Sequence, residues 1–594
     1  MCGIVGFFDK KKRLDESEKH LLLLAMLEKI AHRGNDAQGT FIEGDVAFAH
    51  ARLSIIDLSS LGNQPMKSDK SRLHLSYNGE IYNHRDIRKE LEGKYPFRSQ
   101  SDTETLLYGY EEWGAQILSK IKGMFAFSFY NATTEEIFLA IDRFGIKPLY
   151  YIDSPDWFAW SSEIKALQAL PGVSLSLDKS QLPEYLLFRS LAGQQTLFLG
   201  VKKLLPSEFI SFQLKTKEPV IKRYWELTAH QTSIEGSHEA AILGALEKSV
   251  SEHMLADVPV GIQLSGGVDS SLIGSLVRKN ISPNEELHSF SIGLAEPEWN
   301  EFPYSRLMAE RLNTTHHELV FTEEDFCKAL PTATYYYDEP INHSHSVPMM
   351  LLAEEANKYV KVLMSGEGSD EIFGGYRRYL SLVDNKTLNN KELILSNAFS
   401  SPQEVIALTK CASLNFPYRE KLMEISRAED PLFQLGYYDI HTYLTPLLLR
   451  QDKMGMRSTL ENRVPFLDHE LVQLAFALPL EEKIKEGESK FLLKKVALTY
   501  LPQEISHRKK VGFSQPISVW LRNEKLFGKY LSMVIDANKR RGLFDHATLI
   551  SLRDEHLSGN VDRSGILWTL ITLELWTQIF IDGKEPSTLW QTLS

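Results

Sequence analysis

The second residue of the chain is a cysteine, in the opening stretch Met1-Cys2-Gly3-Ile4-Val5-Gly6. Because cysteine is small, we expect the initiator methionine to be removed, which leaves Cys2 with a free α-amine. An α-amine titrates near ~8 and can accept the proton of its own thiol, so one residue would supply both nucleophile and base. The alternative is a small buried cysteine in an edge strand, and this stretch alone leaves the two interpretations even.

Three later stretches carry groups that hydrolysis of the glutamine amide requires. Arg52 has the fork geometry that clamps a carboxylate. Asn78 and Gly79 could place an amide and a backbone N–H on the oxyanion of a tetrahedral intermediate. Asp102 could bind the ammonium group of glutamine. Each has a simpler explanation when taken singly, namely a surface arginine, an Asn-Gly hairpin turn or a helix cap at Ser101 or Asp102.

A loop suited to a phosphate chain follows an apolar run at residues 258–264. It reads Ser265-Gly266-Gly267-Val268-Asp269-Ser270-Ser271 and leads into a predicted helix. A glycine turn at the start of a helix exposes backbone N–H groups to an anion, and Asp269 offers a carboxylate for Mg²⁺. The loop lacks the Gly-Lys-Ser/Thr of a Walker motif, so kinase-type transfer of a γ-phosphate is not indicated.

An acidic loop follows a second apolar run at residues 361–364. It reads Ser365-Gly366-Glu367-Gly368-Ser369-Asp370-Glu371 and holds three carboxylates in five residues. Carboxylates this close repel one another, so keeping them all charged costs free energy unless a cation or a substrate ammonium lies among them. We therefore interpret the loop as a site for Mg²⁺ and substrate, with a solvated acidic loop as the alternative.

Length and composition limit the classes of protein. At 594 residues the chain is several times the usual domain size, so at least two domains are expected. Hydrophobic residues (43%) and charged residues (24%) occur at globular values. The formal charge of −12 argues against a nucleic-acid partner. The three cysteines form no disulfide framework or zinc spacing, and a reducing cytoplasm fits best.

No export signal or membrane span is expected. The start of the chain lacks an unbroken apolar stretch followed by a cleavage-site pattern. The most apolar late segment, residues 565–581, is interrupted by polar side chains and is typical of a buried core helix.

Two patterns of elements must position these residues. Through about residue 215, short strands dominate, with helices at about 17–31 and 102–113. The expected strands are residues 3–8, 46–50, 72–77, 126–130, 137–141 and 157–161. After a link around 215–235, a strand, turn and helix pattern predicts a parallel sheet with strands at 258–264, 288–294 and 361–364. Because ligands sit beyond the carboxyl ends of parallel strands, the loops that follow these strands are expected to form one site. Beyond about residue 380 the pattern is helical.

The first part of the chain resembles the class II (Ntn-type) glutamine amidotransferase domain. The resemblance rests on Cys2-Gly3-Ile4-Val5-Gly6, His32-Arg33-Gly34, Arg52-Leu53-Ser54-Ile55-Ile56-Asp57, Tyr77-Asn78-Gly79-Glu80-Ile81-Tyr82-Asn83 and Ser101-Asp102-Thr103-Glu104. It implies an α+β domain, an αββα sandwich over residues 2–215, with Cys2 as nucleophile and Asn78 and Gly79 as oxyanion donors. The glutamine contacts that it implies are Arg52, Leu53, Ser54, Ile55, Ile56, Asn78, Gly79, Glu80 and Asp102.

The rest of the chain resembles the glutamine-hydrolysing (B type) asparagine synthetases. Further motifs carry this resemblance: Asp452-Lys453-Met454-Gly455-Met456-Arg457, Glu461-Asn462-Arg463-Val464-Pro465-Phe466-Leu467-Asp468, Ser489-Lys490-Phe491-Leu492-Leu493-Lys494 and Arg508-Lys509-Lys510-Val511-Gly512-Phe513. The resemblance implies a linker at 216–234 and an α/β ATP-pyrophosphatase domain over 235–594, with a parallel sheet and a helical carboxyl-terminal region.

The same resemblance implies roles for residues of the second site, with ATP and Mg²⁺ as cofactors. Asp269 and Asp370 would bind Mg²⁺, Glu367 would serve formation of an acyl-adenylate, and Lys490 would neutralise charge on the phosphates. On pattern alone, Lys490, Arg508 and Lys509 are surface residues of helices. The implied ATP contacts are Leu264, Ser265, Gly266, Gly267, Asp269, Ser270, Ile292, Ser365 and Gly366.

The expected reaction is attack of the aspartate β-carboxylate on the α-phosphate of ATP, followed by attack of ammonia that reaches the acyl-adenylate through an internal tunnel. One segment departs from the family. After Asp338-Glu339-Pro340 its members have a stretch like Ala-Asp-Pro-Ser-Ala-Ile-Pro, whereas this chain has Ile341-Asn342-His343-Ser344-His345-Ser346-Val347-Pro348. The acceptor could therefore be another carboxylate, such as a sugar acid of a surface polysaccharide.

Other interpretations stay open beside that one. His343 and His345 could form a metal pair, but we expect loop or pocket-wall residues because no third ligand is near in sequence. A catalytically silent scaffold is opposed by the intact Cys2, Asp269, Glu367, Asp370 and Lys490. We expect only small-molecule partners (glutamine, aspartate or a related carboxylate, and ATP), no nucleic acid and no membrane, and leave a homodimer open.

Overall fold

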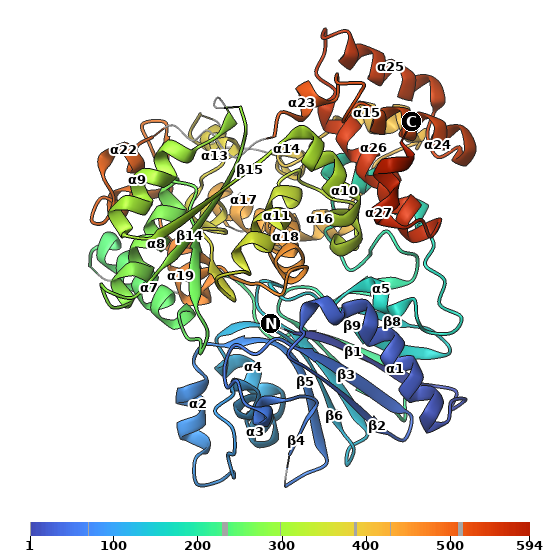
Figure 1. The fold of residues 1–594 in the computed structure, drawn as a ribbon, viewed down its shortest axis with the longest axis vertical. Coiled ribbons are helices and arrows are strands. Elements are labelled where there is room, and N and C mark those ends of the chain that lie inside the picture. Colours follow the sequence, from blue (N-terminus) through green and yellow to red (C-terminus); the bar gives the residue numbers. More distant parts are fainter. Residues whose placement is uncertain are drawn as a thin grey trace.

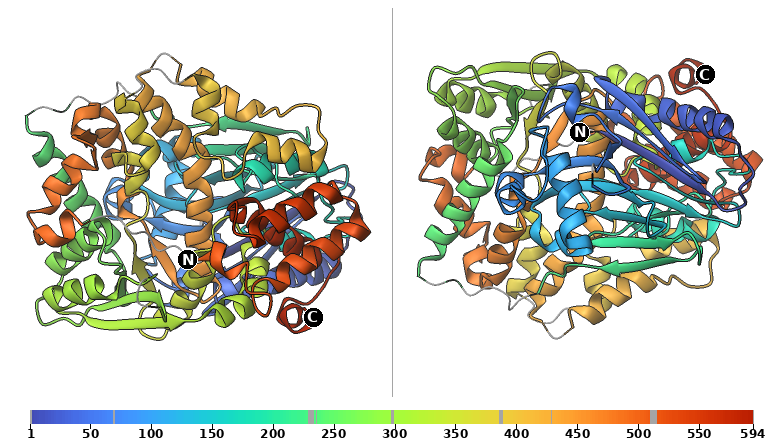
Figure 2. Two further views of the ribbon diagram at one scale, coloured as in Figure 1. Left: turned by 90° about the horizontal axis from the view of Figure 1, so that it is seen from above. Right: turned by 90° about the horizontal axis from the view of Figure 1, so that it is seen from below.

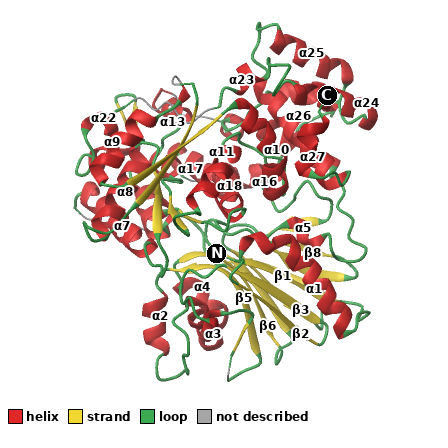
Figure 3. Cartoon of the chain, in the orientation of Figure 1, coloured by secondary structure: helices red, strands yellow, loops and turns green. Residues whose placement is uncertain are grey.

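The computed structural model describes residues 2–68, 70–228, 234, 236–296, 299–384, 389–427, 429–508 and 515–593, with side chains except at 382–384. The chain forms two domains, and the amino terminus lies where they meet (Figure 1). Strands concentrate in the amino-terminal domain and helices in the carboxyl-terminal domain (Figure 3). This division matches the change of pattern in the sequence.

The amino-terminal domain contains two antiparallel sheets of six strands each. The first has the order β10-β8-β9-β1-β3-β2, and the second has the order β12-β11-β7-β6-β5-β4. The strands are β1 (Gly3–Asp9), β2 (Ala37–Glu43), β3 (Val46–Arg52), β4 (Met66–Lys67), β5 (Leu73–Ile81), β6 (Gly123–Asn131), β7 (Glu136–Ile141), β8 (Tyr150–Asp153), β9 (Trp157–Ser161), β10 (Val201–Lys203), β11 (Glu208–Gln213) and β12 (Pro219–Arg223).

Both faces of β1 are buried, which explains its unbroken apolar sequence. Successive side chains of a strand point to opposite faces. Ile4 and Phe8 pack into the core between the two sheets, whereas Val5 and Phe7 belong to the cluster that holds the apolar side of α1 (Glu16–Ile30). Helices α2 (His84–Leu91) and α3 (Asp102–Trp113) pack on the outer face of the second sheet. The expected αββα sandwich is confirmed.

The second sheet extends further along the chain than residue 215. Strand β12 pairs with β11 from Arg223 to Pro219, so part of the stretch 216–234 is sheet. Strand β12 reads Pro-Val-Ile-Lys-Arg and shows no apolar and polar alternation, because at the edge of the sheet none of its side chains is fully buried.

The carboxyl-terminal domain is built on a parallel sheet with the order β15-β14-β13-β16-β17. The three predicted strands are present as β13 (Val260–Gln263), β14 (His288–Leu294) and β16 (Val362–Met364), and β15 (Thr315–Phe321) and β17 (Glu461–Arg463) complete the sheet. Because all neighbours run parallel, the loops after β13, β14 and β16 open at one edge.

Helices cover this sheet and continue beyond it. They include α7 (His238–His253), α8 (Val268–Asn280), α9 (Phe302–Leu312), α10 (Glu323–Tyr337), α11 (Ser346–Ala356), α12 (Ser369–Phe373) and α18 (Thr445–Met456). Three late helices, α24 (Lys529–Arg541), α25 (His546–Leu557) and α26 (Ser564–Trp576), lie at the end of the domain opposite α7 to α9 (Figure 2). Residues Ser564–Ile581 are long and apolar enough to span a membrane, but 83% of this segment is buried in the protein, as expected for a core helix.

Candidate functional site

Cys2 directly precedes β1 and is buried where the two domains meet. Its backbone N donates to Asn78 Oδ1 at 2.8 Å, and its Sγ lies 3.8 Å from Leu53 O. Burial raises the pKa of the Cys2 thiol. Because Asn78 Oδ1 accepts from Cys2, the Asn78 amide is turned so that its Nδ2 is buried without a hydrogen-bond partner among the described residues. A buried donor left unpaired beside a thiol is the group that an oxyanion would satisfy.

Gly79 follows Asn78 in β5 and must be glycine because β6 passes close to it. A Cβ atom at this position would lie 2.2 Å from Met124 O and 2.7 Å from Phe125 Cα. The Asn-Gly pair is therefore not the turn of a hairpin. Both residues sit inside a strand, paired with Ala126 and Phe125.

Arg52 organises a loop near the thiol. Its Nη1 donates to Ser59 O at 2.7 Å and to Asn63 Oδ1 at 2.9 Å, and its Nη2 donates to Asp57 O. The guanidinium therefore fixes the segment 57–63, and the simpler explanation of a surface arginine is wrong, since the residue is only 5% exposed. A clamp on the glutamine carboxylate stays a prediction.

Asp102 lies at the start of α3, a helix that covers the second sheet. Ser101, not Asp102, caps α3, by accepting from Glu104 N. Asp102 Oδ2 instead accepts from Tyr77 Oη at 2.8 Å and from Ile81 N at 2.9 Å. Asp102 Oδ1 has no hydrogen-bond partner within the described ranges. That oxygen is free for a substrate ammonium.

Glu80 is buried on β5 with one oxygen unbonded. Burial, reinforced by Glu461 and Asp102, raises the pKa of Glu80 well above its ordinary value. Its Oε2 lies 3.8 Å from Arg463 Nη2, beyond hydrogen-bond distance. The nearest cation thus comes from β17 of the other domain.

The stretch from Leu53 to Ile56 packs against the carboxyl-terminal domain. Leu53 and Ile55 are buried in a cluster with Val362 of β16 and Met456 of α18, and Ile56 packs on its edge. A glutamine contact from these three residues would therefore use backbone atoms. Ser54 N donates to Asp36 Oδ2 at 2.7 Å, which also fixes the backbone here.

The carboxyl-terminal domain also holds this loop through its backbone. Asp257 N donates to Ile55 O at 2.9 Å, and Asp57 N donates to Asp257 Oδ2 at 2.8 Å. Sequence patterns gave no sign of this role for Asp257.

The glycine loop after β13 has the geometry that the sequence predicts. Gly266 has φ +71°, and a Cβ there would lie 2.5 Å from the backbone of Tyr304, so only glycine fits. Gly267 is the N-cap residue of α8 and has no side chain to cap it, which leaves the first N–H groups of the helix for an anion. Ser265 and Ser270 face each other, with their hydroxyl oxygens 3.0 Å apart.

Asp269 and Asp370 come together around the ammonium group of Lys490. Lys490 Nζ lies 2.7 Å from Asp269 Oδ2 and 2.7 Å from Asp370 Oδ1. It also donates to Ser369 Oγ at 3.0 Å. Burial lowers the pKa of Lys490, but the two carboxylates outweigh it and raise that pKa above its ordinary value. The explanation of Lys490 as a surface residue is wrong.

Two aspartates that share one cation suit Mg²⁺. Mg²⁺ prefers oxygen ligands and is usually bound by one or two carboxylates, with phosphate and water oxygens completing its shell. Among the described residues, no group of three or more His, Cys, Asp or Glu side chains is arranged to hold a metal ion. Asp269 and Asp370 therefore fit a metal that is shared with a nucleotide.

Glu367 is held by two side chains of α18. Arg450 Nη2 lies 2.6 Å and Gln451 Nε2 lies 2.9 Å from Glu367 Oε2. Gln451 Nε2 also donates to Ser365 Oγ at 3.3 Å. Sequence reasoning did not find Arg450 or Gln451, which follow an apolar run of the helix.

Three of the predicted ATP contacts line a cavity beside these groups. Leu264, Ser265 and Ile292 border a space of about 70 Å³ with Phe290 and Phe302. The acidic loop approaches closely, since a Cβ on Gly366 would lie 2.9 Å from Ser270 N. The predicted residues around the glycine loop thus meet at one edge of the sheet.

Two family models match the chain in sequence order. The glutamine amidotransferase domain matches residues 1–225, and asparagine synthase matches residues 241–578. The chain belongs to the asparagine synthase family. It is therefore a carbon–nitrogen ligase that carries out a glutamine-dependent amidation and uses ATP.

Similar proteins match over nearly the whole chain. The chain is 32% identical over 625 residues to glutamine-hydrolyzing asparagine synthetase 1 of Bacillus subtilis (strain 168), covering 98% of each. It is 33% identical over 641 residues to a putative asparagine synthetase of Mycobacterium tuberculosis, again covering 98% of each. Asparagine synthetase B of Escherichia coli (strain K12) is 30% identical over 536 residues, 87% of this chain and 82% of that protein.

Within this asparagine synthase fold, Arg33 joins the two domains directly at the nucleophile. Its Nε donates to Cys2 O at 3.0 Å, its Nη1 to Glu163 Oε1 at 2.9 Å, and its Nη2 to Asp452 Oδ2 at 2.8 Å. Arg33 is fully buried, and the two carboxylates keep it charged. The motif His32-Arg33-Gly34 marked this residue but gave no role for it.

A second ion cluster continues along the domain boundary from Asp338. Lys453 Nζ of α18 lies 3.1 Å from Asp338 Oδ2, and Lys165 Nζ of the amino-terminal domain lies 3.0 Å from Asp338 Oδ1. Asp338 therefore ties both domains to the start of the segment in which this chain departs from its family.

His343 and His345 lie in a turn and not on a strand. Their ring centroids are 6.4 Å apart, and His343 is buried with T-shaped contacts to Phe399 and Tyr443. Burial, with Arg450 second, lowers the pKa of His343 well below its ordinary value. The alternative of a metal pair gains no support, and the expected wall residue agrees with the packing of His343.

Of the motif at residues 508–513, the structure describes only Arg508. Arg508 pairs with Glu301, and its guanidinium lies 4.4 Å from the centre of the Tyr304 ring, next to the glycine loop. Lys509 and the rest of the motif lie outside the described residues.

Proposed function

We propose that this enzyme amidates the β-carboxylate of aspartate to give asparagine. Ammonia comes from glutamine, and ATP is cleaved to AMP and pyrophosphate. The observation that carries the proposal is the ammonium of Lys490 between Asp269 and Asp370, beside a glycine loop that exposes a helix amino terminus. The names of the similar proteins support aspartate as the acceptor.

In the first half-reaction, the Cys2 thiolate attacks the amide carbon of glutamine. Removal of Met1 would free the α-amine that takes the thiol proton. Asn78 Nδ2 and the Gly79 N–H donate to the oxyanion, ammonia leaves, and water hydrolyses the glutamyl thioester. The unpaired Asn78 Nδ2 supports this role, and Asp102 Oδ1 and Glu80 would hold the substrate ammonium.

In the second half-reaction, a carboxylate oxygen of aspartate attacks the α-phosphorus of ATP and pyrophosphate leaves. Lys490 and the amino terminus of α8 neutralise charge on the phosphates. Glu367, held by Arg450 and Gln451, serves this adenylation. When bound by Asp269 and Asp370, Mg²⁺ would supply further positive charge to the phosphates. Ammonia then attacks the acyl carbon, AMP leaves, and the amide nitrogen loses a proton.

A second candidate is the same chemistry on a larger carboxylate, such as a sugar acid. The departure at Ile341–Pro348 favours it, because His343 lies against Phe399 and Tyr443, and aromatic faces suit a sugar ring. Steady-state assays with purified protein separate the two candidates. Aspartate, glutamine and ATP should give asparagine, with pyrophosphate released only when aspartate is present. Absence of both products would reject aspartate as the acceptor.

Replacing Cys2 with alanine tests the separation of the two sites. Cys2→Ala should abolish glutamine-dependent synthesis and leave ammonia-dependent synthesis unchanged, because the described hydrogen-bond partners of Cys2 include no residue of the nucleotide site. The matched control is Cys411→Ala, which removes a free, half-buried thiol elsewhere. Equal loss of both activities in Cys2→Ala would contradict two separate sites. We place the enzyme in the cytoplasm, where a reducing environment keeps Cys2 free.

A further inference from the structure

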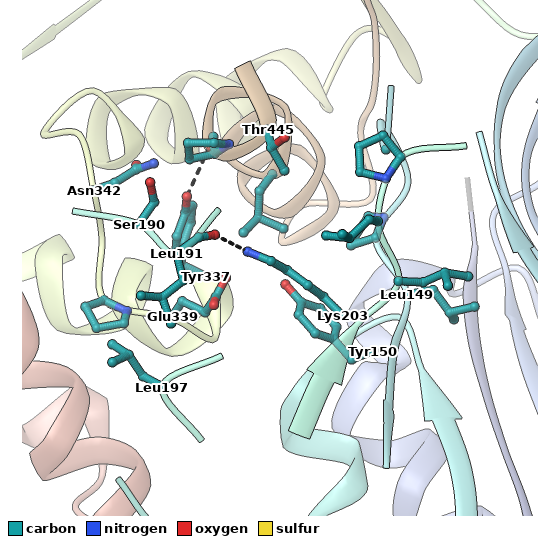
Figure 4. Close-up of a pocket in the computed structure, with 18 of the residues that line it drawn as sticks. Leu149, Tyr150, Ser190, Leu191, Leu197, Lys203, Tyr337, Glu339, Asn342 and Thr445 are labelled. Carbon is teal, nitrogen blue, oxygen red and sulfur yellow. Dashed lines mark hydrogen bonds between the residues drawn. The ribbon is translucent and has the colours of Figure 1, made fainter. Parts of the chain in front are cut away.

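A cavity of about 60 Å³ lies between the two domains (Figure 4). Tyr150 of β8 and Lys203 of β10 border it from the amino-terminal domain. Glu339, Asn342 and the start of α18 at Thr445 border it from the other domain. None of the side chains assigned above to glutamine or nucleotide lines it, and Asn342 comes from the segment in which this chain departs from its family.

Charged groups that make no contact ion pair among the described residues border this cavity. Lys203 Nζ donates to Leu191 O, as Figure 4 shows, but makes no ion pair with any described residue. Glu339 makes neither a hydrogen bond nor an ion pair within the described ranges, and Asn342 Nδ2 is buried without a regular hydrogen bond. Arg189 donates to Thr569 Oγ1 and to backbone carbonyls, and its guanidinium lies 4.1 Å from the centre of the Phe399 ring. Burial lowers the pKa of Arg189 to about 10.

Lys203 and Glu339 are half-buried, and a charge drawn partly out of water costs free energy unless an opposite charge lies close to it. Lys203 and Glu339 border the same cavity without meeting, so a ligand with both charges would satisfy them together. The space accepts about four to six water-sized groups, which matches a carboxylate, an α-carbon and an ammonium. We propose that this cavity binds a small free α-amino acid, about the size of glycine or alanine.

In this arrangement the α-carboxylate meets Lys203, with Arg189 next to it, and the α-ammonium meets Glu339. The ligand would touch both domains at once. Glu339 directly follows Asp338, which already binds Lys453 and Lys165. Occupancy would therefore add a link at the boundary that separates the two half-reactions.

Isothermal titration of the full-length enzyme with glycine and with L-alanine tests the proposal. Saturable binding is expected for the unaltered enzyme, and at least about tenfold weaker binding for Lys203→Met and for Glu339→Gln. The matched control is Lys202→Met, the neighbour on β10 whose side chain points to the opposite face, which should bind as tightly as the unaltered enzyme. Acetate and methylammonium, with one charge each, should bind at least about tenfold more weakly than glycine.

Two outcomes would overturn the proposal. No saturable binding of either amino acid to the unaltered enzyme means that the cavity holds water only. Equal binding by all four proteins places the amino acid at another site. Ammonia-dependent turnover of each variant shows whether that variant is folded. If Lys203→Met does not fold, the comparison of binding by Glu339→Gln with binding by Lys202→Met tests the proposal.

Discussion

The amino-terminal site depends on both domains, whereas the polar contacts of the nucleotide site come from one. Arg33 binds Cys2 O and Asp452 together, and the loop after Arg52 rests on Val362 and Met456. Lys490, Asp269, Asp370, Glu367 and Arg450 all belong to the carboxyl-terminal domain. A weakened boundary should therefore impair glutamine hydrolysis more than ammonia-dependent synthesis.

The largest effect is expected when Arg33 is replaced by methionine. The change leaves Glu163 and Asp452 without one buried partner, so stability should fall by about 3–5 kcal/mol. Urea unfolding measures this loss, and paired assays should show glutaminase activity falling further than ammonia-dependent synthesis. Arg306→Met, which breaks an exposed ion pair with Glu318, is the control and should cost at most about 1 kcal/mol. Equal falls of both activities would refute the idea that glutamine hydrolysis depends more on the domain boundary than ammonia-dependent synthesis does.

Lys490→Met should affect the opposite site. Asp269 and Asp370 lose the cation between them, and phosphate charge is no longer neutralised. Ammonia-dependent synthesis should fall about 10²–10³-fold in kcat, while glutamine hydrolysis is unchanged. Lys494→Met, one turn further along the helix that Lys490 precedes, serves as control, because Lys494 pairs only with Glu488 among the described residues. A parallel loss of glutaminase activity would show that the nucleotide site controls the amino-terminal one.

A buried lysine of the carboxyl-terminal domain differs from those at the boundary. Lys165 and Lys453 are paired with Asp338, but Lys483 makes no ion pair among the described residues, and burial lowers its pKa to about 7. Between that pKa and the ordinary value near ~10.4, the unfolded chain binds more protons, so stability rises with pH.

Lys483→Met should therefore stabilise the enzyme by about 2–3 kcal/mol at pH 7 and below, and the gain should vanish as the pH approaches ~10. Urea unfolding at pH 7, 8.5 and ~10 measures it. The exposed Lys485→Met variant should show no such pH dependence. A gain that is independent of pH would mean that packing, not charge, is responsible.

The smallest effect is expected at Asp257. Asp257→Ala removes the carboxylate that accepts from Asp57 N, which costs about 1 kcal/mol and should raise the KM for glutamine about fivefold with little change in kcat. Ammonia-dependent synthesis should not change. Asp257→Asn keeps an acceptor oxygen and should restore the KM. The control, Asp545→Ala, removes the cap of α25 far from either site. An unchanged KM would show that the apolar packing alone holds the loop.

Local motifs could be predicted from sequence because their chemistry lies within a few residues. The glycine loop before α8 and the acidic loop after β16 each follow a strand, and parallel pairing then places them together. Cys2 and Asn78 were also predicted. The orientation of the Asn78 amide could not be predicted, because it depends on the hydrogen bond from Cys2 N in the folded protein.

Contacts across the boundary could not be predicted in this way. Arg33 and Asp452 are 419 residues apart, and the partner of a buried charge is chosen by how the domains pack. Strand β17 reads Glu-Asn-Arg, without apolar alternation, because Glu461 and Arg463 pair with each other and Asn462 donates to Gln451 O. The contact between Asp57 and Asp257 uses the backbone N–H of Asp57, so the sequence of side chains could not predict it.

The position of Met456 has a consequence for how the protein is made. The β-sandwich is complete at Arg223, and amino-terminal domains generally fold first during synthesis. Yet the loop near Cys2 packs on Met456, and Arg33, which donates to Cys2 O, lacks its partner Asp452 until that residue has been synthesised. Until translation has passed these residues, a nascent chain carries a nucleophile whose loop lacks its support, so it cannot release ammonia efficiently before there is a second domain to receive it.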